Sequence, residues 1–181
     1  MKKIISILFI FAIFCVSTTV NAQELNISSS DNNIDIEIVG NGSAPEEFFD
    51  NPADVLRGQL RSTSKPTVFW NLNSNEYTGN LIEVRRSWLY TNYYFSPSSS
   101  GVLFLDYNIS PINVNGTKML IALYNKSTDK FEQTYTTGGV PTAACIRVAG
   151  LNTNQHYAFA FKAIRDPDAY HGIKGTIKVY H

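Results

Sequence analysis

The sequence predicts an all-β fold, an antiparallel β-sandwich of jelly-roll type with one short helical insertion near its start. From Thr67 onward the chain is a succession of short runs rich in β-branched and aromatic residues. Glycine, proline, asparagine and serine separate these runs at short intervals. Many short strands with frequent turn signals are typical of sandwiches and jelly rolls.

Residues 1–22 have the pattern of a secretory signal peptide. Lys2 and Lys3 precede an apolar run from Ile4 to Val16, and the stretch closes on Val20-Asn21-Ala22. The apolar run is shorter than the roughly 20 residues that a membrane span needs. We therefore expect cleavage after Ala22, export from a bacterial cell to its envelope or surroundings, and no stable membrane insertion afterwards.

The first predicted strand and the helical insertion follow a polar lead-in. Residues 23–33 are rich in serine and asparagine, which predicts a flexible N-terminal segment ahead of a single β-sandwich domain over residues 34–181. Isoleucines then alternate with acidic residues up to Gly40, as in a half-buried strand. Ser43 with Glu46 resembles a capping box, and Asn51-Pro52 resembles a second helix start. Two short helices between residues 43 and 58 are thus expected to plug one end of the sandwich.

The remaining strands follow from β-branched and aromatic runs between turns. They are expected at Thr67–Leu72, Leu81–Val84, Ser87–Phe95, Val102–Tyr107, Lys118–Tyr124, Lys130–Thr136, Ala143–Val148, Tyr157–Ile164 and Thr176–Tyr180. The core is expected to contain Leu81, Val102, Phe104, Leu120, Ala122, Ile146, Val148, Phe159, Phe161, Ile177 and Val179.

Charge and cysteine content narrow the function classes. The chain has 15 basic and 15 acidic residues, and loss of Lys2 and Lys3 would leave a small acidic excess. Such a balance provides no long-range attraction to nucleic acid, so we expect no nucleic-acid partner. Cys145 would be the single cysteine of the exported chain, which excludes an intramolecular disulfide. Its apolar neighbours predict a buried side chain rather than a nucleophile.

The last hundred residues resemble the bacterial pre-peptidase C-terminal (PPC) domain family. The matching segments are Trp88–Phe95, Ser100–Leu105, Lys118–Tyr124, Gln155–Phe161 and Ile173–Tyr180. The family's aspartate-containing stretch near the fourth strand is replaced by residues 116–120, and no peptidase is attached. The resemblance implies a β-sandwich accessory module that contacts polymers such as collagen or polysaccharide.

An aromatic strand is the best candidate ligand site. Trp88, Tyr90, Asn92 and Tyr94 share one face of the predicted Ser87–Phe95 strand, because alternate residues point the same way. Flat aromatic rings suit sugar rings or extended peptides. Arg85 and Arg86, just before the strand, could bind a carboxylate or phosphate. The alternatives are that both faces are covered and that the arginines are solvated or pair with Glu83.

Metal and catalytic sites have weaker signals. Asp166 and Asp168 flank Pro167 and could offer oxygen ligands to Ca²⁺, although the same residues form ordinary turns. No other cofactor is expected. The sequence holds no Gly-x-Ser-x-Gly or His-Glu-x-x-His motif, and a Cys145–His156 pair is the remaining option for a nucleophile and base.

Together these features predict an exported, non-catalytic binding module whose partner is an extracellular polysaccharide or protein. A structural or assembly subunit of the bacterial cell surface, joined through exposed strand edges, is the alternative. A small secreted hydrolase is the third hypothesis.

Overall fold

The computed structural model describes residues 33–44, 59–60, 63–113, 116–140, 142–164 and 172–181. These residues form strands and connecting loops, with no helix among them. The predicted signal peptide and the expected helices at 43–58 lie outside them, except for residues 43–44, which are not helical. Of the predicted lead-in, only Asn33 is described.

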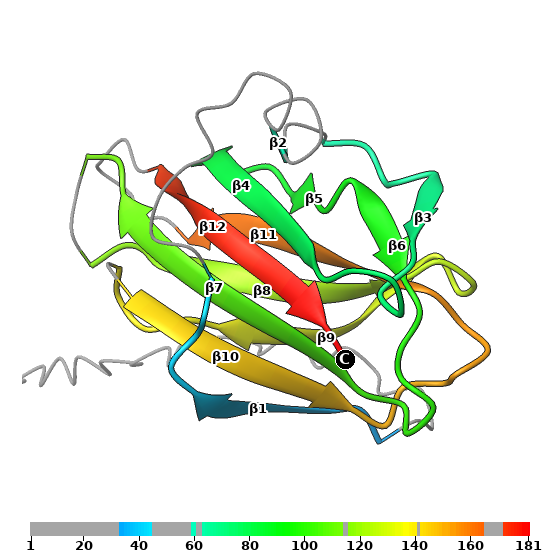
Figure 1. Ribbon diagram of the computed structural model, residues 1–181. Helices are drawn as coiled ribbons and strands as arrows, with labels where there is room; N and C mark the ends of the chain where they lie inside the picture. The colour runs from blue at the N-terminus through cyan, green and yellow to red at the C-terminus, as the bar shows by residue number, and fades with distance from the viewer. Residues whose placement is uncertain (1–32, 45–58, 61–62, 114–115, 141, 165–171) are drawn as a thin grey trace, which may run out of the picture.

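Two sheets pack face to face (Figure 1). Sheet 1 has the order β1-β10-β7-β12-β4-β2, and sheet 2 has the order β3-β6-β11-β8-β9, with β5 also paired to β11. Sheet 1 comprises β1 (Asp35–Gly40), β10 (Thr142–Ala149), β7 (Leu103–Pro111), β12 (Ile173–Tyr180), β4 (Tyr77–Val84) and β2 (Gln59–Leu60). Sheet 2 comprises β3 (Val68–Trp70), β6 (Tyr93–Phe95), β11 (Tyr157–Ile164), β8 (Lys118–Asn125), β9 (Lys130–Thr136) and β5 (Leu89–Tyr90).

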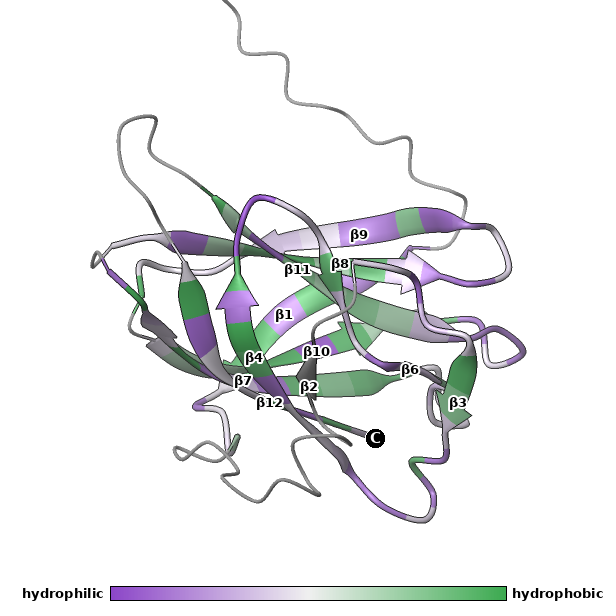
Figure 2. Ribbon diagram, turned by 90° about the horizontal axis from the view of Figure 1, so that it is seen from above, coloured by the Kyte–Doolittle hydropathy of each residue, from purple (hydrophilic) through white to green (hydrophobic). Residues whose placement is uncertain are grey.

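Pairing is antiparallel except between β2 and β4 and between β3 and β6. The edge strands β1 and β9 lie on the same side of the sandwich, where the Gln133 side chain donates to the Ile34 carbonyl at 3.3 Å. Figure 2 shows that β9 is largely hydrophilic along its length. The architecture is therefore the predicted all-β sandwich with two layers.

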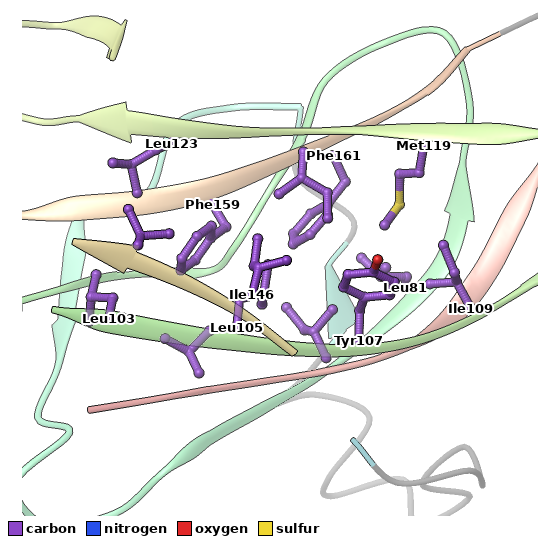
Figure 3. Close-up of a cluster of buried hydrophobic side chains, with 14 of the residues drawn as sticks. Leu81, Leu103, Leu105, Tyr107, Ile109, Met119, Leu123, Ile146, Phe159 and Phe161 are labelled. Carbon is purple, nitrogen blue, oxygen red and sulfur yellow. The ribbon is translucent and has the colours of Figure 1, made fainter. Parts of the chain in front are cut away.

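The core lies between the sheets and is built from alternate residues of each strand (Figure 3). On β7 the inward side chains include Leu103, Leu105 and Tyr107, and β11 contributes Phe159 and Phe161 from the opposite sheet. All five are at most 1% exposed. Because burial of one large apolar side chain is worth about 1.5–3 kcal/mol, this layer is the main source of stability in a domain without a disulfide among its described residues.

The predicted core needs a correction on β7 and β8. Leu81, Ile146, Val148, Phe159, Phe161, Ile177 and Val179 are in the core as expected, and Val102 is buried beside it. Phe104 instead stacks on Tyr180 outside sheet 1, with 5.2 Å between ring centroids. Leu120 is half-buried, whereas Ala122 is fully buried as expected, but in a second hydrophobic cluster. On β8 both faces carry apolar residues, so alternation does not tell the inner face from the outer. On β7 Phe104 is an aromatic residue on an outer face that otherwise carries Asp106, Asn108 and Ser110.

The predicted Ser87–Phe95 strand is divided into β5 and β6 at Thr91 and Asn92. The Thr91 hydroxyl accepts a hydrogen bond from the Phe159 amide at 3.2 Å and donates one to the Tyr93 carbonyl at 3.0 Å. Its backbone amide donates to the Phe159 carbonyl at 2.8 Å. The side chain thus replaces backbone partners, and the strand is interrupted without leaving these groups unsatisfied.

A buried carboxylate holds the segment after β1 against the outer face of sheet 1. Asp106 is 1% exposed and accepts hydrogen bonds from the Ser43 amide at 2.7 Å and the Ser43 hydroxyl at 2.5 Å. The Tyr180 hydroxyl donates to its other oxygen at 3.2 Å. Next to Ser43, a Cβ on Gly42 would lie 2.4 Å from the Ala144 carbonyl oxygen, so glycine permits this close approach.

Candidate functional site

The outer face of sheet 2 carries a cluster of aromatic rings, here termed the aromatic face: Trp88, Tyr90, Tyr94, Tyr124 and Phe131. The rings pack over the small side chains of Ala122, Ala158 and Ala160 in the middle of the sheet. Tyr90 meets Tyr124 edge-on at 5.7 Å, and Trp88 packs on Phe131 at 4.7 Å between centroids. Small residues in the centre therefore leave room for the rings contributed by neighbouring strands.

Most of the aromatic face is already covered. Tyr90 and Tyr94 are 6% and 3% exposed, and burial raises the pKa of both hydroxyls. The ammonium group of Lys126 lies 5.0 Å from the Tyr94 ring centroid, and that of Lys65 lies 4.7 Å from the Tyr124 centroid. The predicted site residues Tyr90 and Tyr94 thus share the face expected from the alternation, but their rings form a packed layer rather than an open platform.

Trp88 is only partly buried, unlike Tyr90 and Tyr94, and it lines a hollow of about 510 Å³. We refer to it as the Trp88 hollow; its described lining residues are Thr63, Ile82, Glu83, Arg85, Ser87, Trp88 and Leu89. Two of the predicted site residues, Trp88 and Arg85, therefore meet in one concave place. The lining combines an indole ring and aliphatic carbons with hydroxyl, carboxylate and guanidinium groups, a composition that suits a ligand with both apolar and polar faces.

The backbone around the Trp88 hollow is tied to sheet 2. The Arg85 carbonyl accepts a hydrogen bond from the Ala163 amide at 2.8 Å, and Leu89 pairs with Phe161 on β11. The Arg85 guanidinium donates to the Glu83 carboxylate, as one of the sequence alternatives proposed. These side chains are 43% and 47% exposed, so the ion pair stays accessible to water and to a ligand.

The other predicted ligand residues are placed differently. Arg86 is exposed and lies between Arg85 and Ser87 in the chain. Asn92 is half-buried in the link between β5 and β6, away from the described lining of the hollow. The structure adds Lys162, whose ammonium nitrogen lies 5.7 Å from the Trp88 ring centroid. Sequence reasoning missed Lys162 because strand pairing between β5 and β11 brings it there across a long separation in the chain.

A second, smaller hollow of about 230 Å³ lies beside His156 and is lined in part by Phe69, Ser96 and His181. The Ser96 hydroxyl and His156 Nδ1 are 3.0 Å apart, and the Phe69 ring packs on the imidazole at 4.2 Å. Burial, together with the nearby Lys126 ammonium, lowers the pKa of His156. The imidazole is therefore neutral at pH 7.

The suggested Cys145–His156 pair does not form. Cys145 lies on β10 of sheet 1, where its sulfur is 3.4 Å from the Tyr180 hydroxyl oxygen, whereas His156 immediately precedes β11 of sheet 2. Burial and the neighbouring Asp106 raise the pKa of the thiol to about 11. Cys145 is 6% exposed, as predicted for a buried side chain, and is protonated at neutral pH.

Asp166 and Asp168, the predicted calcium ligands, lie outside the described residues. Within the described part of the chain, no three or more histidine, cysteine, aspartate or glutamate side chains are grouped so that they could hold a metal ion. The same residues include no helix that is long and apolar enough to cross a membrane.

Comparisons with known proteins identify no family. No family model matches the chain, and no curated protein matches it. Among solved structures, a family GH115 4-O-methyl-alpha-glucuronidase with specificity for decorated arabinogalactans resembles it at 12% sequence identity and a TM-score of 0.37. The match covers 65% of this chain and 18% of the glucuronidase chain, and we infer no function from it.

Proposed function

We propose that this protein is an exported, non-catalytic binding module that contacts an extracellular polysaccharide or protein through the Trp88 end of its aromatic face. A polysaccharide is the favoured ligand. The Trp88 hollow carries this proposal, because it combines a partly buried indole ring with the Arg85, Glu83 and Ser87 side chains in one concave place. An indole supplies a large contact area at little entropic cost, while the polar groups can orient hydroxyls.

We infer a jelly roll, with a helical insertion at 43–58, related to PPC modules. Two four-strand orders, β10-β7-β12-β4 and β6-β11-β8-β9, support the jelly roll. From β6 to β12 the chain crosses to the other sheet at every step except from β8 to β9, as in a jelly roll of two Greek keys. Export to the cell envelope or surroundings is supported by the pattern of residues 1–22.

The test is retention of the chain from Gln23 on insoluble polysaccharides, cell-wall material and collagen. We expect Trp88→Ala to weaken retention about thirtyfold, the loss typical of a central aromatic contact. Trp70→Phe is the matched control, because Trp70 packs on Tyr77 and Tyr93 and its indole N–H donates to the Asn75 carbonyl at 2.9 Å. Retention that is equal in the wild type and Trp88→Ala would overturn the site, and no retention on any material would overturn the proposal.

Assembly at the cell surface is the second candidate, and edge strand β1 favours it. Ile38 and Val39 on this strand are 59% and 46% exposed. An exposed strand edge with apolar side chains can pair with a further strand. Sedimentation would detect such pairing: self-association that is lost in Ile38→Lys supports this candidate, and a strictly monomeric wild type contradicts it.

A further inference from the structure

Positive charge gathers at the Trp88 hollow although the whole chain has a formal net charge of zero. Arg85 lines the hollow, Arg86 is exposed next to it in the chain, and the Lys162 ammonium lies 5.7 Å from the Trp88 ring centroid. The opposing charge in the described lining is Glu83, which already pairs with Arg85. Any attraction to an anion must therefore be local to this hollow, since the molecule has no overall field to provide it.

Strand register explains why the cation and the indole lie together. Ala160 pairs with Tyr90 and Phe161 with Leu89 in the antiparallel β11–β5 ladder. If the same register continues by one residue, Lys162 lies across from Trp88. Lys162 and Ala160 are two residues apart on β11 and so point to the same outer face, where Tyr90 and Trp88 also lie. The cation beside the ring is thus set by sheet geometry rather than by a chance side-chain position.

The Arg85 guanidinium and the Glu83 carboxylate, both from residues that line the hollow, form an ion pair. Both side chains are nearly half exposed, so water screens their attraction and a ligand carboxylate can compete for the guanidinium. Arginine binds carboxylates with two parallel hydrogen bonds, which gives a preference in geometry as well as in charge. Glu83 then competes with an anionic ligand for the Arg85 guanidinium and opposes its binding.

We propose that the Trp88 hollow selects polysaccharides that carry carboxylate groups, such as polymers of uronic acids. A sugar ring stacks on Trp88, its carboxylate binds the Arg85 guanidinium, and Lys162 and Arg86 add attraction for the neighbouring charges of the polymer. This inference rests on the proposed function and adds the substrate class. A neutral polysaccharide could stack on the indole ring but would form no ion pair with Arg85, Lys162 or Arg86.

The test compares a uronic-acid polymer with its uncharged ester, which has the same backbone, and with a carboxylate polymer that is not a sugar. Migration of the chain from Gln23 is measured in native gels containing polygalacturonate, its fully methyl-esterified form or poly-glutamate, without calcium. We expect polygalacturonate to bind at least tenfold more tightly than the ester. Arg85→Gln and Lys162→Gln should each reduce that binding by about five- to tenfold. Glu83→Gln, which removes the opposing charge, should strengthen it about threefold.

Arg147→Gln is the matched control, since Arg147 lies on sheet 1 and pairs with Glu37 at 2.8 Å. Arg147→Gln changes the net charge by the same amount as Arg85→Gln and Lys162→Gln, and this variant should bind polygalacturonate as tightly as the wild type. Equal binding of polygalacturonate and its ester, both lost in Trp88→Ala, would overturn this inference and leave the proposed function intact. Equal binding of poly-glutamate would overturn the sugar selectivity. No binding of any polymer, with none on the insoluble materials, would overturn both.

Discussion

Replacement of Asp106 by asparagine is expected to destabilise the fold by about 2 kcal/mol at pH 7. The carboxylate is buried and holds residues 42–44 on sheet 1 through two hydrogen bonds from Ser43. Asparagine has nearly the same shape, so the substitution tests the charge rather than the volume. Asp35→Asn, at an exposed position on β1, is the matched control and should leave stability unchanged.

The magnitude follows from the kind of hydrogen bond that is lost. Bonds to a charged group contribute about 1.5–3 kcal/mol each, and neutral bonds contribute about 0.5–1.5 kcal/mol. An asparagine whose carbonyl oxygen faces Ser43 keeps both bonds in the weaker form, so each bond loses about 1 kcal/mol. For a domain of this size, a total of 2 kcal/mol lowers the melting temperature by about 4–8 °C.

The lowered pKa of Asp106 determines how its contribution to stability changes with pH. Burial acts to raise the pKa of Asp106, but hydrogen bonds from Cys145, Ser43 and Tyr180 outweigh it and hold the pKa below the ordinary value. The stabilisation is therefore fully present above about pH 4 and is lost as the pH falls through the folded-state pKa. Urea unfolding followed by circular dichroism at pH 7 and at pH 3 would measure it. Equal stability of wild type and Asp106→Asn at pH 7, or a difference that does not narrow at pH 3, would show that the Asp106 charge does not stabilise the fold.

Three further predictions concern packing and reactivity. Gly42→Ala should lower the melting temperature because its Cβ would meet the Ala144 carbonyl at 2.4 Å, whereas Gly40→Ala, with open space around it, should not; equal melting temperatures would contradict the close approach. Phe161→Ala should cost about 3–5 kcal/mol in urea unfolding, since Phe161 is fully buried between the sheets, and a loss below 1 kcal/mol would contradict its place in the core. Cys145 should react with a thiol reagent at pH 8 only after denaturant is added, because burial and Asp106 raise its pKa to about 11; rapid labelling of the folded protein would contradict this environment.

The strands could be predicted from local sequence because β-branched and aromatic runs end at clear turn residues. The order along the chain and most strand positions agree with the structure, from the isoleucine-rich β1 to β12. β2, with two residues, carries too little pattern to be recognised. β4 begins at Tyr77 rather than Leu81, because Gly79 and Asn80 read as turn residues although they continue the ladder with Ile177 and Thr176.

The inner face of a strand could be predicted only where the outer face is polar. On β8 the aromatic cover of sheet 2 allows Ala122 to be buried on the outer side, so apolar or aromatic residues occur at every position from Met119 to Tyr124. Ser43 shows another limit of local patterns: its hydroxyl donates to Asp106, a residue 63 positions away, while a capping box considers only its near neighbours. Glu46 lies outside the described residues.

Alternation along one strand predicts part of the candidate site, but it does not predict the residues that neighbouring strands contribute. Alternation placed Trp88, Tyr90 and Tyr94 on one face, as the structure has them. Alternation does not predict that other rings bury Tyr90 and Tyr94, because those rings, Tyr124 and Phe131, come from β8 and β9. The position of Lys162 depends on the pairing of β11 with β5, which a single sequence does not reveal.

Ligand contact at Trp88 is tested by a fluorescence titration of the Trp70→Phe variant. The chain contains two tryptophans, so Trp88 is the remaining one in this variant. A soluble polysaccharide identified by retention is added while the emission of Trp88 is recorded. We expect a saturable shift of the emission to shorter wavelength, with the same midpoint as binding, because a sugar ring replaces water on the exposed part of the indole. Saturable binding that leaves the Trp88 emission unchanged would contradict ligand contact at Trp88.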